Sequence, residues 1–177
     1  MSSDEEKKAP RSWKRKALSW GLQLLLMVVV IFVVSEWQAR HLLARSTPAP
    51  ALVLPSLDGD QVSLADARGK TVVLYFFAPW CSVCNYSSHN IVALRNARSA
   101  DDLAIYAVGL AYNRPGDVAR FAREHELNVP VLLGDSDVQR RFNVNSFPTI
   151  YIIDGDGEVR DRVIGYTTEL GLRLRSL

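Results

Sequence analysis

The sequence is poor in the residues from which disulfide scaffolds and metal clusters are built. Its 177 residues include two cysteines, three histidines and two methionines. Two cysteines are too few for a disulfide-rich scaffold or for a four-cysteine zinc site, and three histidines leave little room for a histidine-built metal cluster. We therefore expect neither a bound metal nor a cofactor.

A large excess of charge of one sign is also absent. The net charge is +2, and the first 45 residues hold eight basic and four acidic residues. The remaining chain has 13 basic and 15 acidic residues, so it is slightly acidic. This balance argues against nucleic acid as a partner, because nucleic-acid binding needs a basic surface.

A long uncharged run near the N-terminus predicts a membrane anchor. A helix from Ala17 to Ser35 spans about 28 Å, close to the roughly 30 Å hydrocarbon core of a bilayer. The run is longer than the roughly 7 to 15 apolar residues of a signal peptide, which favours an uncleaved anchor. The N-terminal flank is the more basic, so the N-terminus is expected in the cytoplasm and the C-terminal domain outside. The predicted order is a cytoplasmic tail (1–16), a transmembrane anchor (17–37), a linker (38–50) and a folded domain (51–177).

The folded domain alternates between strand and helix patterns, which predicts a mixed α/β sheet. The continuous apolar run over 71–77 is typical of a strand that is buried on both faces. A second buried strand is expected over 104–110. The expected helices are 82–97, 115–126, 137–142 and 167–175, and the expected hairpins join 52–54 to 62–64 and 149–153 to 158–164.

The two cysteines lie where a strand, a short turn and a helix follow one another. Cys81 is placed at the helix start, where unpaired N–H groups and the helix dipole favour thiolate over thiol. We therefore expect Cys81 to be the attacking sulfur. Cys84 lies one turn later on the same side, where it can close a disulfide or resolve a mixed disulfide.

Other interpretations of the pair explain less. A structural disulfide over so short a loop removes little chain entropy, and a zinc site lacks a second pair. A c-type haem site needs His after Cys84, where the chain has Asn85. Two unrelated buried cysteines do not explain the strand–turn–helix setting. Dithiol–disulfide exchange is favoured, and Cu(I) binding by the same two thiolates is the alternative, because soft sulfur ligands suit that ion.

These motifs resemble those of membrane-anchored thioredoxin-like proteins of the TlpA/ResA type. Trp80-Cys81-x-x-Cys84 after an apolar strand matches the thioredoxin active site, and Ser146-Phe147-Pro148-Thr149 matches the cis-proline loop. Residues 131–135 and the following hairpin match the branch with an inserted strand–helix unit. Residues 163–173 resemble the ScsD branch, which is associated with suppression of copper sensitivity.

The resemblance implies a thioredoxin-like fold and a protein dithiol–disulfide oxidoreductase that uses Cys81 and Cys84. It implies a cis bond before Pro148, with Phe147 and Pro148 docking an extended substrate chain and Trp80 shaping the rim. It also implies a single-pass protein of the bacterial inner membrane with a periplasmic catalytic domain. Its substrates are protein thiols and disulfides, a membrane redox partner resets the pair, and the reductase direction is slightly favoured.

Two positions depart from the family pattern. Thioredoxin has a buried Asp at the position of Tyr75, and proteins like ResA have a Glu at the position of Ser87. Because neither acid is present, the proton of Cys84 is expected to pass to water, Ser87 or Ser88, or to have no dedicated acceptor.

Overall fold

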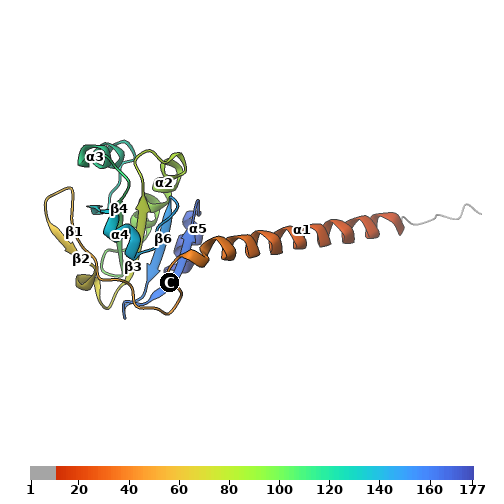
Figure 1. Cartoon of the computed structure of the whole chain (residues 1–177). Coiled ribbons are helices and arrows are strands. Elements are labelled where there is room, and N and C mark those ends of the chain that lie inside the picture. Colours follow the sequence, from red (N-terminus) through yellow and green to blue (C-terminus); the bar gives the residue numbers. More distant parts are fainter. Residues whose placement is uncertain (1–10) are drawn as a thin grey trace, which may run out of the picture. The chain divides into compact units, whose positions relative to one another are not determined.

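The computed structural model describes residues 11–177, and Figure 1 shows how their elements follow one another. Within this range the side chains at 11–17, 32, 35, 36, 38 and 39 lie outside the description, as do residues 1–10 of the predicted tail. The contacts divide the chain into two units, Met1–Gln38 and Ala39–Leu177.

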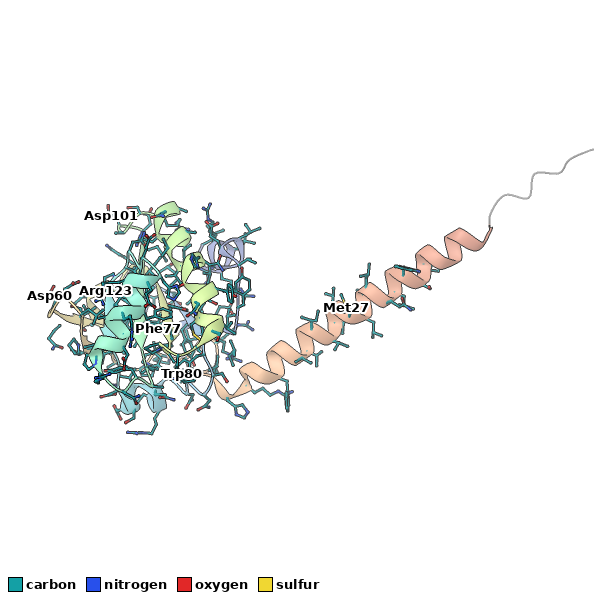
Figure 2. All side chains as sticks on the ribbon, turned by 90° about the horizontal axis from the view of Figure 1, so that it is seen from above. Met27, Asp60, Phe77, Trp80, Asp101 and Arg123 are labelled. Carbon is teal, nitrogen blue, oxygen red and sulfur yellow. A yellow bond between two sulfur atoms is a disulfide. The ribbon has the colours of Figure 1, made fainter. Side chains whose placement is uncertain are left out.

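The first unit contains one helix, α1 (Arg11–Gln38), which covers the predicted anchor over 17–37. Its described apolar side chains are exposed, and Figure 2 shows Met27 projecting from the helix. Among the described residues, no helix combines the length and the apolar character that crossing a membrane requires. The predicted span includes Ala17, Phe32, Ser35 and Glu36, whose side chains are not described.

The second unit is built on a five-stranded mixed sheet with the strand order β5-β4-β3-β6-β7. The sequence-based expectation of a mixed sheet flanked by helices is confirmed. The short 3-10 helices η1 and η2 span Ala39–His41 and Leu64–Ala67. The strands are β1 (Val53–Pro55), β2 (Gln61–Ser63), β3 (Thr71–Phe77), β4 (Leu103–Gly109), β5 (Val131–Leu133), β6 (Thr149–Ile153) and β7 (Val159–Ile164). The helices are α2 (Ser82–Ala97), α3 (Pro115–Glu124), α4 (Ser136–Arg141) and α5 (Glu169–Arg175).

Strand β3 is central because its apolar side chains fill both faces of the sheet. It pairs with β4 in parallel and with β6 in antiparallel register, so neither edge is open. Alternate residues from Val73 to Phe77 pack with α2, α3 and α5 on one face. The others, from Val72 to Phe76, pack with β1 and α4 on the opposite face. Such two-sided burial is what a continuous apolar run predicts.

Strand β5 and helix α4 follow one another where a strand–helix unit is expected from residues 131–135. Strand β5 extends the sheet beyond β4 in parallel register. Asp135 caps α4, because its carboxylate accepts the N–H of Val138 over 2.8 Å. The unit therefore adds an edge strand without disturbing β3.

Residues 42–49 lie against the domain, although the sequence predicts a linker over 38–50. Leu42 is buried in the core, and Arg45 pairs with Asp161 over 2.7 Å. The backbone of Ser46 and Ala49 donates hydrogen bonds to carbonyl oxygens at the start of β7 and in its preceding turn. The proline and alanine content of this segment is typical of a linker. The buried side chain of Leu42 and the backbone hydrogen bonds nevertheless fix the segment to the domain.

A candidate redox site beyond the central strand

The register of the sheet brings three loops to one end of β3. Phe76 faces Thr149 across the antiparallel pair, so the end of β3 lies beside the start of β6. The N–H of Leu110 donates to the carbonyl of Phe77 over 2.8 Å, which brings the end of β4 to the same place. The segments 78–81, 111–113 and 146–148 therefore meet at this end of the sheet.

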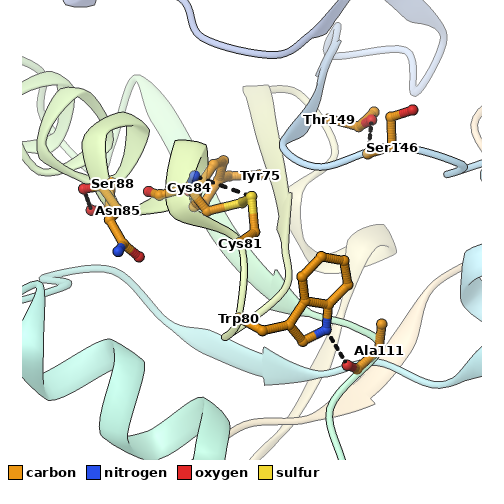
Figure 3. Close-up of a disulfide and its surroundings, with 9 residues drawn as sticks. All are labelled: Tyr75, Trp80, Cys81, Cys84, Asn85, Ser88, Ala111, Ser146 and Thr149. Carbon is orange, nitrogen blue, oxygen red and sulfur yellow. Dashed lines mark hydrogen bonds between the residues drawn. A yellow bond between two sulfur atoms is a disulfide. The ribbon is translucent and has the colours of Figure 1, made fainter.

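Cys81 and Cys84 form a disulfide at the start of α2, with their Cα atoms 5.2 Å apart (Figure 3). Cys81 is the N-cap of the helix, and its Sγ accepts the N–H of Cys84 over 3.2 Å. Cys81 is 7% exposed and Cys84 is fully buried. The helix start thus presents one sulfur at the surface and keeps the other beneath it. Because the N–H of Cys84 and the positive end of the helix dipole lie at the Cys81 sulfur, this sulfur is the better placed to carry negative charge.

Aromatic side chains border the disulfide. Trp80 is 68% exposed, and its Nε1–H donates to the carbonyl oxygen of Ala111 over 2.8 Å (Figure 3). The Trp80 ring meets the Phe147 ring edge-on, with centroids 5.8 Å apart. Phe147 is half-buried and Pro148 is buried. The peptide bond between them is cis, as the resemblance implies.

The two positions that lack an acid are occupied by buried hydroxyl groups. The Tyr75 hydroxyl donates to the carbonyl oxygen of Cys84 over 3.0 Å, and burial raises the pKa of Tyr75. Ser88 donates to the carbonyl of Asn85 over 2.7 Å. The buried hydroxyl of Ser87 has no hydrogen-bond partner among the described residues. The environment of Cys84 is therefore neutral.

Three residues of this region were not predicted from the sequence. Ala111 supplies the acceptor for Trp80 from a backbone with a left-handed φ of 49°. Tyr86 of α2 is 71% exposed, and Tyr166, which lies near it, is 55% exposed. The exposure of Tyr86 could have been predicted from the sequence, because its position lies off the buried stripe of α2. The role of Ala111 depends on where β4 ends in space, which no local pattern gives.

The described residues contain no group of three or more His, Cys, Asp or Glu side chains that could hold a metal ion. The two sulfur atoms are bonded to each other. What the arrangement can do chemically is thiol–disulfide exchange, since a disulfide with one accessible sulfur can accept a thiolate and form a mixed disulfide.

Comparisons with known proteins agree with this chemistry. Residues 46–162 match the model of the AhpC/TSA family. The chain is 36% identical over 123 residues to the thioredoxin-like protein YneN of Bacillus subtilis, covering 68% of this chain and 72% of that protein. It is 29% identical over 159 residues to the thiol-disulfide oxidoreductase ResA of Geobacillus kaustophilus, covering 88% and 91%.

Solved structures agree with the fold. The thioredoxin domain of a thiol-disulfide oxidoreductase from Bacteroides vulgatus superposes with a TM-score of 0.65 at 26% identity. The match covers 75% of this chain and 96% of that domain. The disulfide at the start of α2, the mixed sheet and these relatives lead to one assignment. The chain belongs to the AhpC/TSA family and is a thioredoxin-like thiol-disulfide oxidoreductase of the ResA type, an enzyme that acts on protein disulfides.

Proposed function

We propose that this oxidoreductase reduces protein disulfides outside the cytoplasmic membrane, with Cys81 as the attacking sulfur and Cys84 as the resolving one. The observation that carries the proposal is the unequal exposure of the pair: Cys81 is 7% exposed, and Cys84 is fully buried. Only Cys81 can therefore meet a sulfur of another protein without the helix unfolding. Its position at the N-terminal end of α2 also stabilises a thiolate.

The reaction begins with the reduced pair. The Cys81 thiolate attacks one sulfur of the substrate disulfide, that bond breaks, and the other substrate sulfur leaves as a thiolate that takes up a proton. Cys84 then loses its proton and attacks the Cys81 sulfur. The mixed disulfide breaks, the second substrate thiol leaves, and the Cys81–Cys84 disulfide forms. Two electrons have passed from the pair to the substrate.

In this proposal the substrate docks on the rim of the site, which consists of Trp80, Phe147 and Pro148. Phe147 and Pro148 present a backbone edge beside the disulfide, where an extended substrate chain can lie. Trp80 is held by its bond to Ala111 and contacts Phe147. A membrane redox protein returns two electrons to the pair after each turnover, because the sequence has no third cysteine that could supply them.

The location of the domain is part of the proposal. Its support is the uncharged run from Ala17 to Ser35, the more basic N-terminal flank and the exposed apolar side chains of α1. On this basis the protein is anchored in a bacterial inner membrane with its catalytic domain in the periplasm. Fractionation of cells, followed by protease treatment of spheroplasts, tests this part: the domain should be digested and residues 1–16 protected. A protein recovered intact in the cytoplasmic fraction would contradict it.

The Cu(I) alternative and the ScsD branch have weaker support. Two thiolates can hold Cu(I), but no further cluster of metal-ligating side chains adjoins them among the described residues. The ScsD assignment is supported by the closing sequence over 163–173 alone. Titration of the reduced protein with Cu(I) tests the alternative, because the absence of tight binding would exclude it. Tight binding together with failure to reduce any protein disulfide would contradict the redox function.

The reduction potential of the Cys81–Cys84 pair tests the direction of electron flow. The full chain is equilibrated with glutathione buffers of known potential, and alkylation of free thiols reports the reduced fraction. The proposal predicts a value near the roughly −270 mV of thioredoxin. A value near about −120 mV, which is typical of a strong oxidant, would overturn the reductase direction.

A further inference from the structure

The outer face of α5 carries exposed leucines. Leu170 and Leu174 lie one turn apart in the helix and are 64% and 62% exposed, and Leu177, which follows the helix, is 68% exposed. Leu172 points the other way and is buried in the core with the two cysteines. Among the described residues of the second unit, every exposed leucine belongs to this group. The helix is therefore apolar on two faces, and the core covers one of them.

Basic side chains border these leucines. Residues 170–177 include Arg173 and Arg175 and no acidic residue. Arg173 pairs with Glu169 and Arg175 with Asp161, yet the two arginine side chains remain 47% and 40% exposed. An arginine can keep its apolar stem against neighbouring leucines while its charged end reaches water or a phosphate. Exposed leucines bordered by arginines are typical of a helix that lies on the surface of a bilayer.

The same helix lies close to the segment through which the chain enters the domain. Asp161 of β7 accepts hydrogen bonds from Arg45 and from Arg175 of α5, so one carboxylate joins the entry segment to the helix. Leu42, in the same segment, is buried in the core. The exposed leucines are thus on a face of the domain that adjoins its entry point.

A short connection limits how far the domain can move from the proposed membrane anchor. Helix α1 ends at Gln38, and the chain is fixed in the domain from Leu42 onward. At no more than about 3.6 Å per residue, this connection spans at most about 14 Å. That is no longer than the radius of gyration of about 14 Å expected for a domain of this size. A domain anchored in this way stays at the bilayer, and a face that adjoins the entry point is the one that meets it.

We propose that the outer face of α5 rests on the membrane surface, with its leucines at the edge of the apolar layer and Arg173 and Arg175 at anionic phosphate groups. This inference rests on the proposed membrane location and adds an interaction surface and its partner, an anionic bilayer. Strand β7 ends at Ile164, which pairs with Thr149 at the end of the sheet that carries the disulfide. Because α5 begins shortly after Ile164, its contact with the bilayer keeps the redox pair within reach of a membrane-embedded partner.

A bilayer accounts for this surface better than a second copy of the chain does. Helix α5 has seven residues. Its three exposed leucines offer far less than the roughly 800 Å² that each partner buries in a stable protein interface. Two copies would also bring their arginines together, whereas lipid phosphates supply the opposite charge.

Photo-crosslinking of the full chain tests the inference. Benzoylphenylalanine replaces Leu174 of α5, Met27 of α1 or Val53 of β1, and each protein is reconstituted in vesicles of phosphatidylcholine and phosphatidylglycerol. On irradiation this side chain bonds to C–H groups that it touches, and mass spectrometry separates lipid adducts from dimers. All three native side chains are more than half exposed. Val53 is the control, because the residues after β1 pair with β5, at the edge of the sheet opposite to β7.

We expect lipid adducts at Met27 and at Leu174, with a yield at Leu174 at least about fivefold above that at Val53. Adding Leu170→Ser to the protein labelled at position 174 should lower that yield by about half, because one of the inserted leucines is lost. Every protein should reduce hydroxyethyl disulfide, a small soluble disulfide, at the wild-type rate, which reports that the domain is folded and the redox pair intact.

A lipid adduct at Met27 without one at Leu174, equal yields at Leu174 and Val53, or a dimer in place of the lipid adduct at Leu174 would overturn the inference and leave the proposed function intact. Absence of a lipid adduct at Met27 would contradict the proposed membrane location, and the inference would fall with it.

Discussion

The hydroxyl of Tyr75 donates a hydrogen bond to the carbonyl oxygen of Cys84 over 3.0 Å. This bond joins the middle of the sheet to the first turn of α2, because Tyr75 lies in β3 and Cys84 in the helix. Burial raises the pKa of Tyr75, so its hydroxyl remains a neutral donor at the pH at which exchange takes place. The residue therefore holds the backbone of the resolving cysteine and does not accept its proton.

Replacement of Tyr75 by Phe should lower the free energy of unfolding without changing the pH profile of exchange. The variant keeps the ring, whose centroid lies 5.7 Å from that of Phe77, and loses one buried hydrogen bond. The expected loss is about 1 kcal/mol, measured by urea denaturation. Tyr151→Phe is a control on the other face of the sheet, where the hydroxyl donates to the carbonyl of Phe142 over 2.6 Å and accepts the N–H of Leu43 over 3.1 Å. A shifted pH profile in Tyr75→Phe alone would show that the hydroxyl takes part in proton transfer.

Replacement of Trp80 by Phe should slow exchange with protein disulfides and leave stability nearly unchanged. The indole N–H loses its bond to Ala111, so the ring is no longer fixed against Phe147. Because Trp80 is 68% exposed, the free energy of unfolding should change by no more than about 0.5 kcal/mol. The rate with a protein disulfide should fall by about fivefold. A small disulfide should react at the wild-type rate.

The matched control is Trp37→Phe, since Trp37 is also an exposed tryptophan but belongs to α1. Equal losses in the two variants would contradict a docking role for Trp80.

Replacement of Asp161 by Asn should destabilise the domain at neutral pH and less so in acid. Burial alone would raise the pKa of Asp161, but hydrogen bonds from Arg45, Arg175 and the backbone of Arg162 hold it below its usual value. A carboxylate with a lowered pKa in the folded state contributes stability above about pH 4 and loses it as the pH falls further. The expected cost at pH 7 is about 1 kcal/mol.

Urea denaturation at pH 7 and pH 3 checks this prediction, and the difference between wild type and Asp161→Asn should shrink at the lower pH. Asp137→Asn is the control, because Asp137 is 55% exposed and pairs with neighbouring arginines on α4. It should cost less than about 0.5 kcal/mol. A constant difference at both pH values would mean that the charge of Asp161 is not what stabilises the fold.

The sequence predicts the elements around the disulfide closely, because local patterns specify them. The apolar run over 71–77 and the helix over 82–97 have the predicted bounds in the structure. The helix expected to end at residue 126 ends at Glu124, since His125 leaves the helical conformation and Glu126 has a left-handed φ of 49°. Backbone reversals of this kind carry no hydrophobic periodicity, so they cannot be located from the pattern.

The rim of the site depends on contacts between residues far apart in the chain. The bond from Trp80 to Ala111 spans 31 positions, and the bond from Gly165 to Pro148 requires that β6 and β7 pair in register. The motif around Cys81 predicts the chemistry, because it is local. The position of Tyr166 near Tyr86 of α2 becomes visible only once the sheet is assembled.

The most direct test of the central claim is whether a protein substrate becomes covalently attached through Cys81. Full-length Cys84→Ser, Cys81→Ser and wild type are reduced, mixed with a disulfide-containing protein and separated without reductant. We predict a mixed disulfide in Cys84→Ser that dithiothreitol releases, no adduct in Cys81→Ser, and complete turnover in the wild type. An adduct or turnover in Cys81→Ser would contradict the assignment of Cys81 as the attacking sulfur.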